Sequence, residues 1–129
     1  MPNPKDKRER EGRCRLCGRG KHIRSLTRHH LIPKRRRGRF LGPMNHDHNI
    51  VPLCRPCHDE VELAIERKID RIVLVYLRRS LTADEVAFII DYMGIAFLNR
   101  MYPSRPERPR QEIVDFAKRH GDRLIRAGS

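Results

Sequence analysis

The sequence contains CRLC at residues 14–17 and CRPC at residues 54–57, and these two stretches hold all four cysteines of the chain. Each Cys-x2-Cys pair can supply two thiolates from one tight turn. Two such pairs complete the tetrahedron of ligands that a structural Zn²⁺ ion prefers. The spacing therefore predicts a structural zinc site with four ligands, which are Cys14, Cys17, Cys54 and Cys57.

The alternative for the same cysteines is a pair of disulfide bonds in a secreted protein. Disulfides persist in oxidising compartments, and residues 1–30 show no apolar targeting stretch. The longest uninterrupted apolar run, residues 72–77, is too short to cross a bilayer. We therefore favour zinc over disulfides and expect a soluble, cytoplasmic protein.

Positive charge is concentrated at the N-terminal end of the chain. Residues 1–40 carry 15 Lys or Arg and 3 Asp or Glu, so they account for nearly all of the net charge of +13. A one-sided basic field favours a nucleic-acid partner, although a solvated basic tail is the plainer alternative. We expect the tail at residues 1–12, because it is polar and lacks periodicity. We expect phosphate contacts from Lys34, Arg35, Arg36, Arg37 and Arg39.

The remaining patterns predict a coarse order of elements. Apolar residues recur at three- and four-residue steps from about residue 55 to residue 79, which is the period of an α-helix. Thr82 and Glu85 have the spacing of a capping box that opens a further helix. We expect a strand at 22–32, a loop at 34–48, a strand at 49–53, a helix at 55–79, a helix from 82 to before Pro103, a proline-rich linker at 103–109 and a short helix at 110–126.

Histidine and asparagine residues accompany the two cysteine pairs in a fixed order. His29 and His30 lie between the pairs, Asn49 precedes the second pair, and His58 follows it directly. In this order the chain resembles the zinc-finger-bearing branch of the HNH endonucleases, over about residues 14–66. The resemblance implies a small zinc-stapled ββα-metal core at residues 13–68. Together with the helical patterns that follow, it leads us to expect an α+β fold with a mostly α-helical extension at 69–129, a segment that the resemblance does not cover.

The resemblance also implies roles in the hydrolysis of DNA. Cutting a phosphodiester requires a base that deprotonates water and a cation that stabilises the developing charge. Neighbouring residues of a strand point to opposite faces, so His29 and His30 should do different jobs. By resemblance, His30 is the general base, His29 and His58 hold a divalent cation, and Asn49 holds the active-site loop and orients the base. Mg²⁺ is the expected cation, and histidine at position 29 admits Mn²⁺, Ni²⁺ or Zn²⁺.

Several points stay open on the sequence alone. Glu62 lies one helical turn after His58 and is either a third ligand or a solvated residue, of which we favour the second. The chain could also be a zinc-stapled nucleic-acid-binding module without catalysis, or a structural protein that docks through residues 60–129. A homodimer or a larger protein partner on the C-terminal helices is left open. Surface positions are expected for His22, His46, His48 and His120, with a role beside the site left open for His46 and His48.

Overall fold

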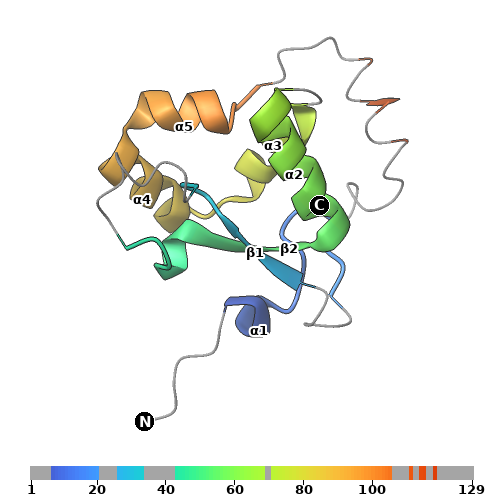
Figure 1. Cartoon of the computed structure of the whole chain (residues 1–129), viewed down its shortest axis with the longest axis horizontal. Coiled ribbons are helices and arrows are strands. Elements are labelled where there is room, and N and C mark those ends of the chain that lie inside the picture. Colours follow the sequence, from blue (N-terminus) through green and yellow to red (C-terminus); the bar gives the residue numbers. More distant parts are fainter. Residues whose placement is uncertain are drawn as a thin grey trace.

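The fold is α+β, as expected, and is built around a two-stranded antiparallel sheet. The computed structural model describes residues 7–20, 26–33, 43–68 and 71–105, together with single positions at 111, 114, 115 and 118. Figure 1 shows the hairpin crossing the middle of the molecule between α1 and the other helices. The elements are α1 (Lys7–Glu11), β1 (Leu26–His30), the 3₁₀ helix η3 (Asp47–Asn49), β2 (Ile50–Cys54), α2 (Arg55–Arg67), α3 (Ile72–Ser80), α4 (Ala83–Met93) and α5 (Ile95–Met101).

The hairpin and α2 form a continuous ββα unit. In the register of the sheet His29 lies opposite Val51 and His30 lies opposite Ile50. All five residues of β2 are buried, so this strand fixes the hairpin inside the core. Helix α2 begins directly after β2, and Pro56 lies in its first turn, where its missing N–H costs no helical hydrogen bond. This succession of β1, β2 and α2 therefore positions β1 and the first turns of α2 side by side.

Both long helices that the sequence predicts are interrupted in the structure. The predicted helix at 55–79 ends at Arg67, where Lys68 adopts a left-handed conformation with φ of 55°, and α3 begins at Ile72. The predicted helix from 82 divides into α4 and α5 at Gly94, which has φ of 88°. The apolar period continues across both interruptions, so the sequence pattern did not reveal them. The capping box of Thr82 and Glu85 is confirmed at the start of α4.

The prediction of a disordered tail at residues 1–12 is wrong for residues 7–11. Residues 7–11 form α1, and Lys7 is buried. The ammonium of Lys7 donates to the backbone carbonyls of Asp47 and Ile50 and pairs with the buried carboxylate of Glu85. Arg15 also pairs with Glu85, at 2.6 Å. Because Glu85 is 78 residues from Lys7 in the sequence, no local pattern could signal that α1 would be anchored.

One buried apolar cluster joins the ββα unit to the helices that follow it. The cluster contains residues of the hairpin, of α2 and of α3 to α5, among them Leu31, Val51, Leu53, Val61, Leu77, Ile89 and Leu98. The helical extension therefore packs on the ββα unit and shares its core. The predicted final helix at 110–126 lies mostly outside the described residues. Within the described ranges, no helix is both long enough and apolar enough to cross a membrane.

We predict that Glu85→Gln lowers the free energy of unfolding by about 3–5 kcal/mol, because it removes the carboxylate that pairs with the buried Lys7 and with Arg15, of which Arg15 keeps Glu11 as a second partner. Asp84→Asn is the matched control, since Asp84 is the preceding residue of α4 and its side chain is 79% exposed. The control should cost less than about 1 kcal/mol. Urea denaturation of both variants measures the difference, and an equal loss in the two would contradict the prediction.

The same ionic network predicts a dependence of stability on pH. Burial alone would raise the pKa of Glu85, but its hydrogen bonds with Arg15 and Lys7 outweigh burial and hold that pKa below the ordinary value of 4.5. A carboxyl whose pKa is lower in the folded state stabilises the fold above its unfolded pKa and loses that contribution in acid. Stability should therefore decline as the pH falls below about 4.5, and Glu85→Gln should weaken this decline.

Candidate metal centres and active site

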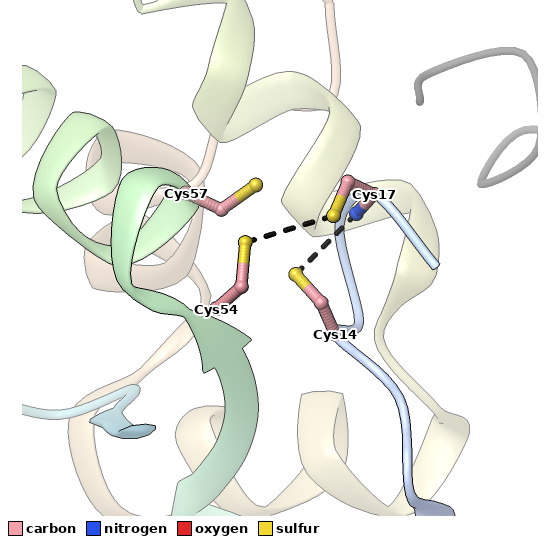
Figure 2. Close-up of side chains that lie close together, drawn as sticks. All are labelled: Cys14, Cys17, Cys54 and Cys57. Atoms are coloured by element: carbon pink, nitrogen blue, oxygen red, sulfur yellow. Dashed lines mark hydrogen bonds between the residues drawn. The ribbon is translucent and has the colours of Figure 1, made fainter. Parts of the chain in front are cut away.

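The four cysteines converge from two places that are distant in the sequence. Figure 2 shows their sulfur atoms directed toward a common centre, two from the turn at residues 14–17 and two from the junction of β2 and α2. All four are buried free cysteines, and their sulfurs lie within 4.8 Å of one another. The Sγ atoms of Cys17 and Cys54 are 3.6 Å apart. A disulfide needs about 2.0 Å, whereas sulfurs around a tetrahedral zinc lie about 3.8 Å apart.

Backbone hydrogen bonds explain why the first pair adopts this geometry. The N–H of Gly18 donates to the carbonyl of Cys14, and the N–H of Cys14 donates to the carbonyl of Arg19, which closes a tight turn. Gly18 has φ of 80°, a conformation that favours glycine. The N–H of Arg15 donates to the carbonyl of Pro52 and so ties this turn to β2. The four buried thiols thus form a site that can hold a structural metal such as zinc.

A second cluster joins His29 of β1 with His58 and Glu62 of α2. One donor atom from each of these residues lies within 4.8 Å of the other two. The Oε1 atom of Glu62 is 3.2 Å from Nδ1 of His29 and 3.3 Å from Nε2 of His58. Our preference for a solvated Glu62 is therefore corrected. Its side chain is 47% exposed, yet one of its oxygens contacts both imidazoles.

Hydrogen bonding fixes which nitrogen of His29 carries the proton. The hydroxyl of Tyr102 donates its one proton to the backbone carbonyl of Leu31, at 2.8 Å. Tyr102 Oη lies 2.9 Å from Nε2 of His29 and can only accept there. Nε2 of His29 must therefore carry the hydrogen. The lone pair of His29 is then on Nδ1, the atom that faces Glu62.

The same arrangement recurs at His58 with a threonine in place of the tyrosine. The hydroxyl of Thr27 donates to the carbonyl of Leu53 at 2.7 Å and contacts Nδ1 of His58. Thr27 Oγ1 has no second proton to give, so Nδ1 of His58 must donate to it. The lone pair of His58 is then on Nε2, which again faces Glu62.

Three electron-rich atoms consequently point at one another in this cluster. Burial lowers the pKa of His29 below its ordinary value, which disfavours a second proton on that ring. Glu62 supplies the carboxylate oxygen of the cluster. Two imidazole nitrogens and one carboxylate oxygen are a donor set that suits a divalent cation. Three protein ligands also leave coordination positions open, as catalytic metal sites do.

His30 and Asn49 are not among the donors of this cluster and have other partners. Nε2 of His30 contacts the Oδ1 atom of Asn45 at 3.0 Å, and because an amide oxygen only accepts, the lone pair of His30 is on Nδ1. Asn49 is fully buried and joins the end of β1 to the loop before η3. Its Oδ1 accepts from the N–H of Ile32, and its Nδ2 donates to the carbonyl of Met44. Asn49 therefore ties the end of β1 to this loop, while the residue that contacts His30 is Asn45. The role of Asn49 in catalysis stays a prediction.

Three residues of the site escaped the sequence analysis. Thr27 is two positions before His29 in the same strand, so the alternation of β1 could have placed both on the face toward α2. Asn45 lies in a loop with no signal of its own. Tyr102 is 73 residues from His29, and no spacing in the sequence joins them.

The expected DNA-contacting residues and the four remaining histidines lie either outside the described residues or away from the metal-binding groups. The expected DNA-contacting residues Lys34, Arg35, Arg36, Arg37 and Arg39 lie outside the described residues, as do His22 and His120. His46 stacks on Phe88 of α4 at a centroid distance of 4.8 Å, and His48 meets the edge of the same ring. Neither belongs to a metal-binding group among the described residues. We therefore place His46 and His48 at the contact between the loop and α4.

A comparison with protein families matches the same segment. The family model described as HNH endonuclease covers residues 14–62, which begin at the first zinc-site cysteine and end at Glu62. The match identifies an HNH endonuclease domain at residues 14–62, which suggests a nuclease or nucleic-acid-binding function. Comparisons with curated proteins and with solved structures each find no match.

We predict that the purified protein contains about one tightly bound zinc ion per chain and that Cys57→Ser abolishes this binding. Loss of the metal should also unfold the N-terminal half, because metal-binding free energy contributes directly to folding in such small units. Elemental analysis and thermal denaturation measure the two effects. A metal-free protein that retains the full cooperative transition would contradict the prediction.

We predict that Glu62→Gln weakens the binding of a divalent cation at the second cluster by at least about tenfold, because it removes the one charged ligand. Glu66→Gln is the matched control, since Glu66 lies one turn further along α2 and is exposed. Calorimetric titration with Mn²⁺, on zinc-loaded protein without DNA, measures the affinities. An equal affinity in the two variants would show that Glu62 is no ligand.

Proposed function

We propose that this chain is a metal-dependent endonuclease that hydrolyses phosphodiester bonds of DNA. The observation that carries the proposal is the convergence of lone pairs on His29 Nδ1, His58 Nε2 and Glu62 Oε1 within an HNH endonuclease domain. A zinc-stapled binding module would need a basic surface but no such cluster. The HNH family match supports the nuclease class, and the donor geometry supports catalysis within it.

His30 is the general base in this proposal. Its Nε2–H is held by Asn45, so Nδ1 is the nitrogen that would take a proton from the attacking water. The contact with Asn45 also fixes the orientation of the ring as the imidazolium forms. His30 directly follows the ligand His29 in β1, and Asn49 holds the strand end to the adjoining loop. In this proposal the base and the cation ligand His29 are neighbouring residues of the same strand.

His29, His58 and Glu62 would hold the divalent cation. When bound, the cation supplies positive charge that stabilises the pentacovalent phosphorus centre and the departing oxygen. Two imidazole ligands raise the intrinsic affinity for Mn²⁺, Ni²⁺ or Zn²⁺, whereas Mg²⁺ prefers oxygen ligands and keeps several waters. We therefore propose that Mn²⁺ or Ni²⁺ binds more tightly than the Mg²⁺ that the family resemblance favours.

DNA is the proposed partner on electrostatic grounds. The basic residues of the first forty positions lie in and next to the zinc-clamped part of the chain. Lys34, Arg35, Arg36, Arg37 and Arg39 fall inside the matched HNH segment, between His30 and Asn49. Contacts of this kind would position the phosphate backbone without reading its sequence.

We predict that His30→Ala lowers the rate of DNA cleavage by a factor of about 10² to 10⁴, the usual contribution of a positioned general base. Zinc content, the thermal transition and DNA affinity should stay unchanged. His48→Ala is the control, because His48 is a histidine of η3 that belongs to neither metal-binding group and whose side chain is 39% exposed. Relaxation of supercoiled plasmid with added Mn²⁺, Ni²⁺ or Mg²⁺ measures the rate.

Two results would count against this assignment. If His30→Ala cuts as fast as the wild type in the same metal, His30 is not the base. If the wild type binds DNA but cuts no form of it with any of these metals, the chain is a nucleic-acid-binding module and the endonuclease proposal is wrong.

A further inference from the structure

Tyr102 lies beyond the HNH segment and yet contacts one of its proposed ligands. The family match ends at Glu62, whereas Tyr102 follows the last turn of α5 in the helical extension. Its side chain is fully buried, and its ring meets the ring of His29 at a centroid distance of 6.3 Å in an edge-to-face arrangement. The extension therefore reaches the proposed cation site through the side chain of Tyr102.

The position of Tyr102 is fixed from both ends of the residue. Its backbone N–H donates to the carbonyl of Leu98 within α5, and its carbonyl accepts from the guanidinium of Arg78 on α3, each at 2.8 Å. Its hydroxyl donates to the carbonyl of Leu31, immediately after β1. With its backbone held by α3 and α5 and its proton committed to Leu31, the hydroxyl presents only an acceptor to His29.

We infer that Tyr102 is a positioning residue that selects the metal-binding form of His29, so that the helical extension is part of the cation site. The inference rests on the proposed function only in taking His29 as a cation ligand. With the hydroxyl present, the hydrogen of His29 is held on Nε2, and Nδ1 offers its lone pair beside Glu62. A hydrogen-bond acceptor behind a ligating histidine commonly sets its tautomer and orientation in this way.

Removing the hydroxyl should reverse the tautomer of His29. In Tyr102→Phe, a hydrogen on Nε2 would lie in a buried environment without an acceptor, because His29 is only 1% exposed. A hydrogen on Nδ1 would instead reach the carboxylate of Glu62, 3.2 Å away. The ring should therefore carry its hydrogen on Nδ1 and lose the lone pair that faces the cation. Phenylalanine would fill the same volume, so packing should change little.

The experiment compares Tyr102→Phe with Tyr92→Phe in the full chain. Tyr92 lies on α4, is 46% exposed and provides the same chemical change away from the site. Imidazole ¹⁵N spectra of zinc-loaded protein without added Mn²⁺ report the tautomer of His29. Calorimetric titration with Mn²⁺ alone, without DNA, reports affinity at the second cluster. Zinc content and the thermal transition check that each variant is folded.

We expect hydrogen on Nε2 of His29 in the wild type and in Tyr92→Phe, and hydrogen on Nδ1 in Tyr102→Phe. Affinity for Mn²⁺ should fall about 10- to 100-fold in Tyr102→Phe alone, the range seen when a residue behind a metal ligand is removed. Hydrogen on Nδ1 of His29 in the wild type would overturn the inference. So would a Tyr102→Phe protein that is less stable but keeps its tautomer and its Mn²⁺ affinity, because Tyr102 would then only fill the core.

These outcomes are separate from the fate of the proposed function. A wild type that binds Mn²⁺ but cuts no DNA would refute the endonuclease proposal. The tautomer and affinity of Tyr102→Phe would still support or overturn the positioning role, since neither measurement involves cleavage.

Discussion

The convergence of four cysteines on one centre that can hold a metal ion is the constraint on which the rest of the structure depends. It joins the turn at residues 14–17 to the junction of β2 and α2. A small chain with a limited core gains much from such a cross-link. Because α2 begins at this junction, the cysteine site also sets where His58 and Glu62 lie relative to β1. The proposed cation site is thus a geometric consequence of the cysteine site.

Hydrogen-bond direction organises the three site histidines in a common way. Each ring has one nitrogen whose hydrogen is held by an oxygen that can only accept there, from Tyr102, Thr27 or Asn45. The opposite nitrogen of each ring then carries a lone pair. In His29 and His58 that lone pair faces Glu62. In His30 it is on Nδ1, which would accept a proton from water in the proposed function. In the proposed function, these neutral side chains would assign the ligands and the base without any additional charge.

The segments outside the HNH domain are integrated into it through buried contacts. Lys7 and Arg15 share the carboxylate of Glu85, which links the N-terminal helix and the first cysteine turn to α4. Tyr102 links α5 to His29 in the same manner. Breaking such buried contacts costs far more than breaking exposed ones, because the partner left behind stays desolvated. The extension is therefore coupled to the stability of the domain and, by our inference on Tyr102, to its proposed cation site.

The sequence by itself determined the features whose signals are local. The two Cys-x2-Cys pairs indicated the four-cysteine site, the Thr82 and Glu85 spacing indicated a helix start, and the order of His29, His30, Asn49 and His58 indicated the HNH site. Tertiary structure alone decided the partnerships of Glu62, Tyr102 and Lys7, because these depend on which surfaces meet after folding. The helix breaks at Lys68 and Gly94 likewise depend on left-handed backbone that an uninterrupted apolar period conceals. The period of the apolar residues shows which face of an element is buried. It does not show which side chain packs against that face, because that side chain comes from another part of the chain.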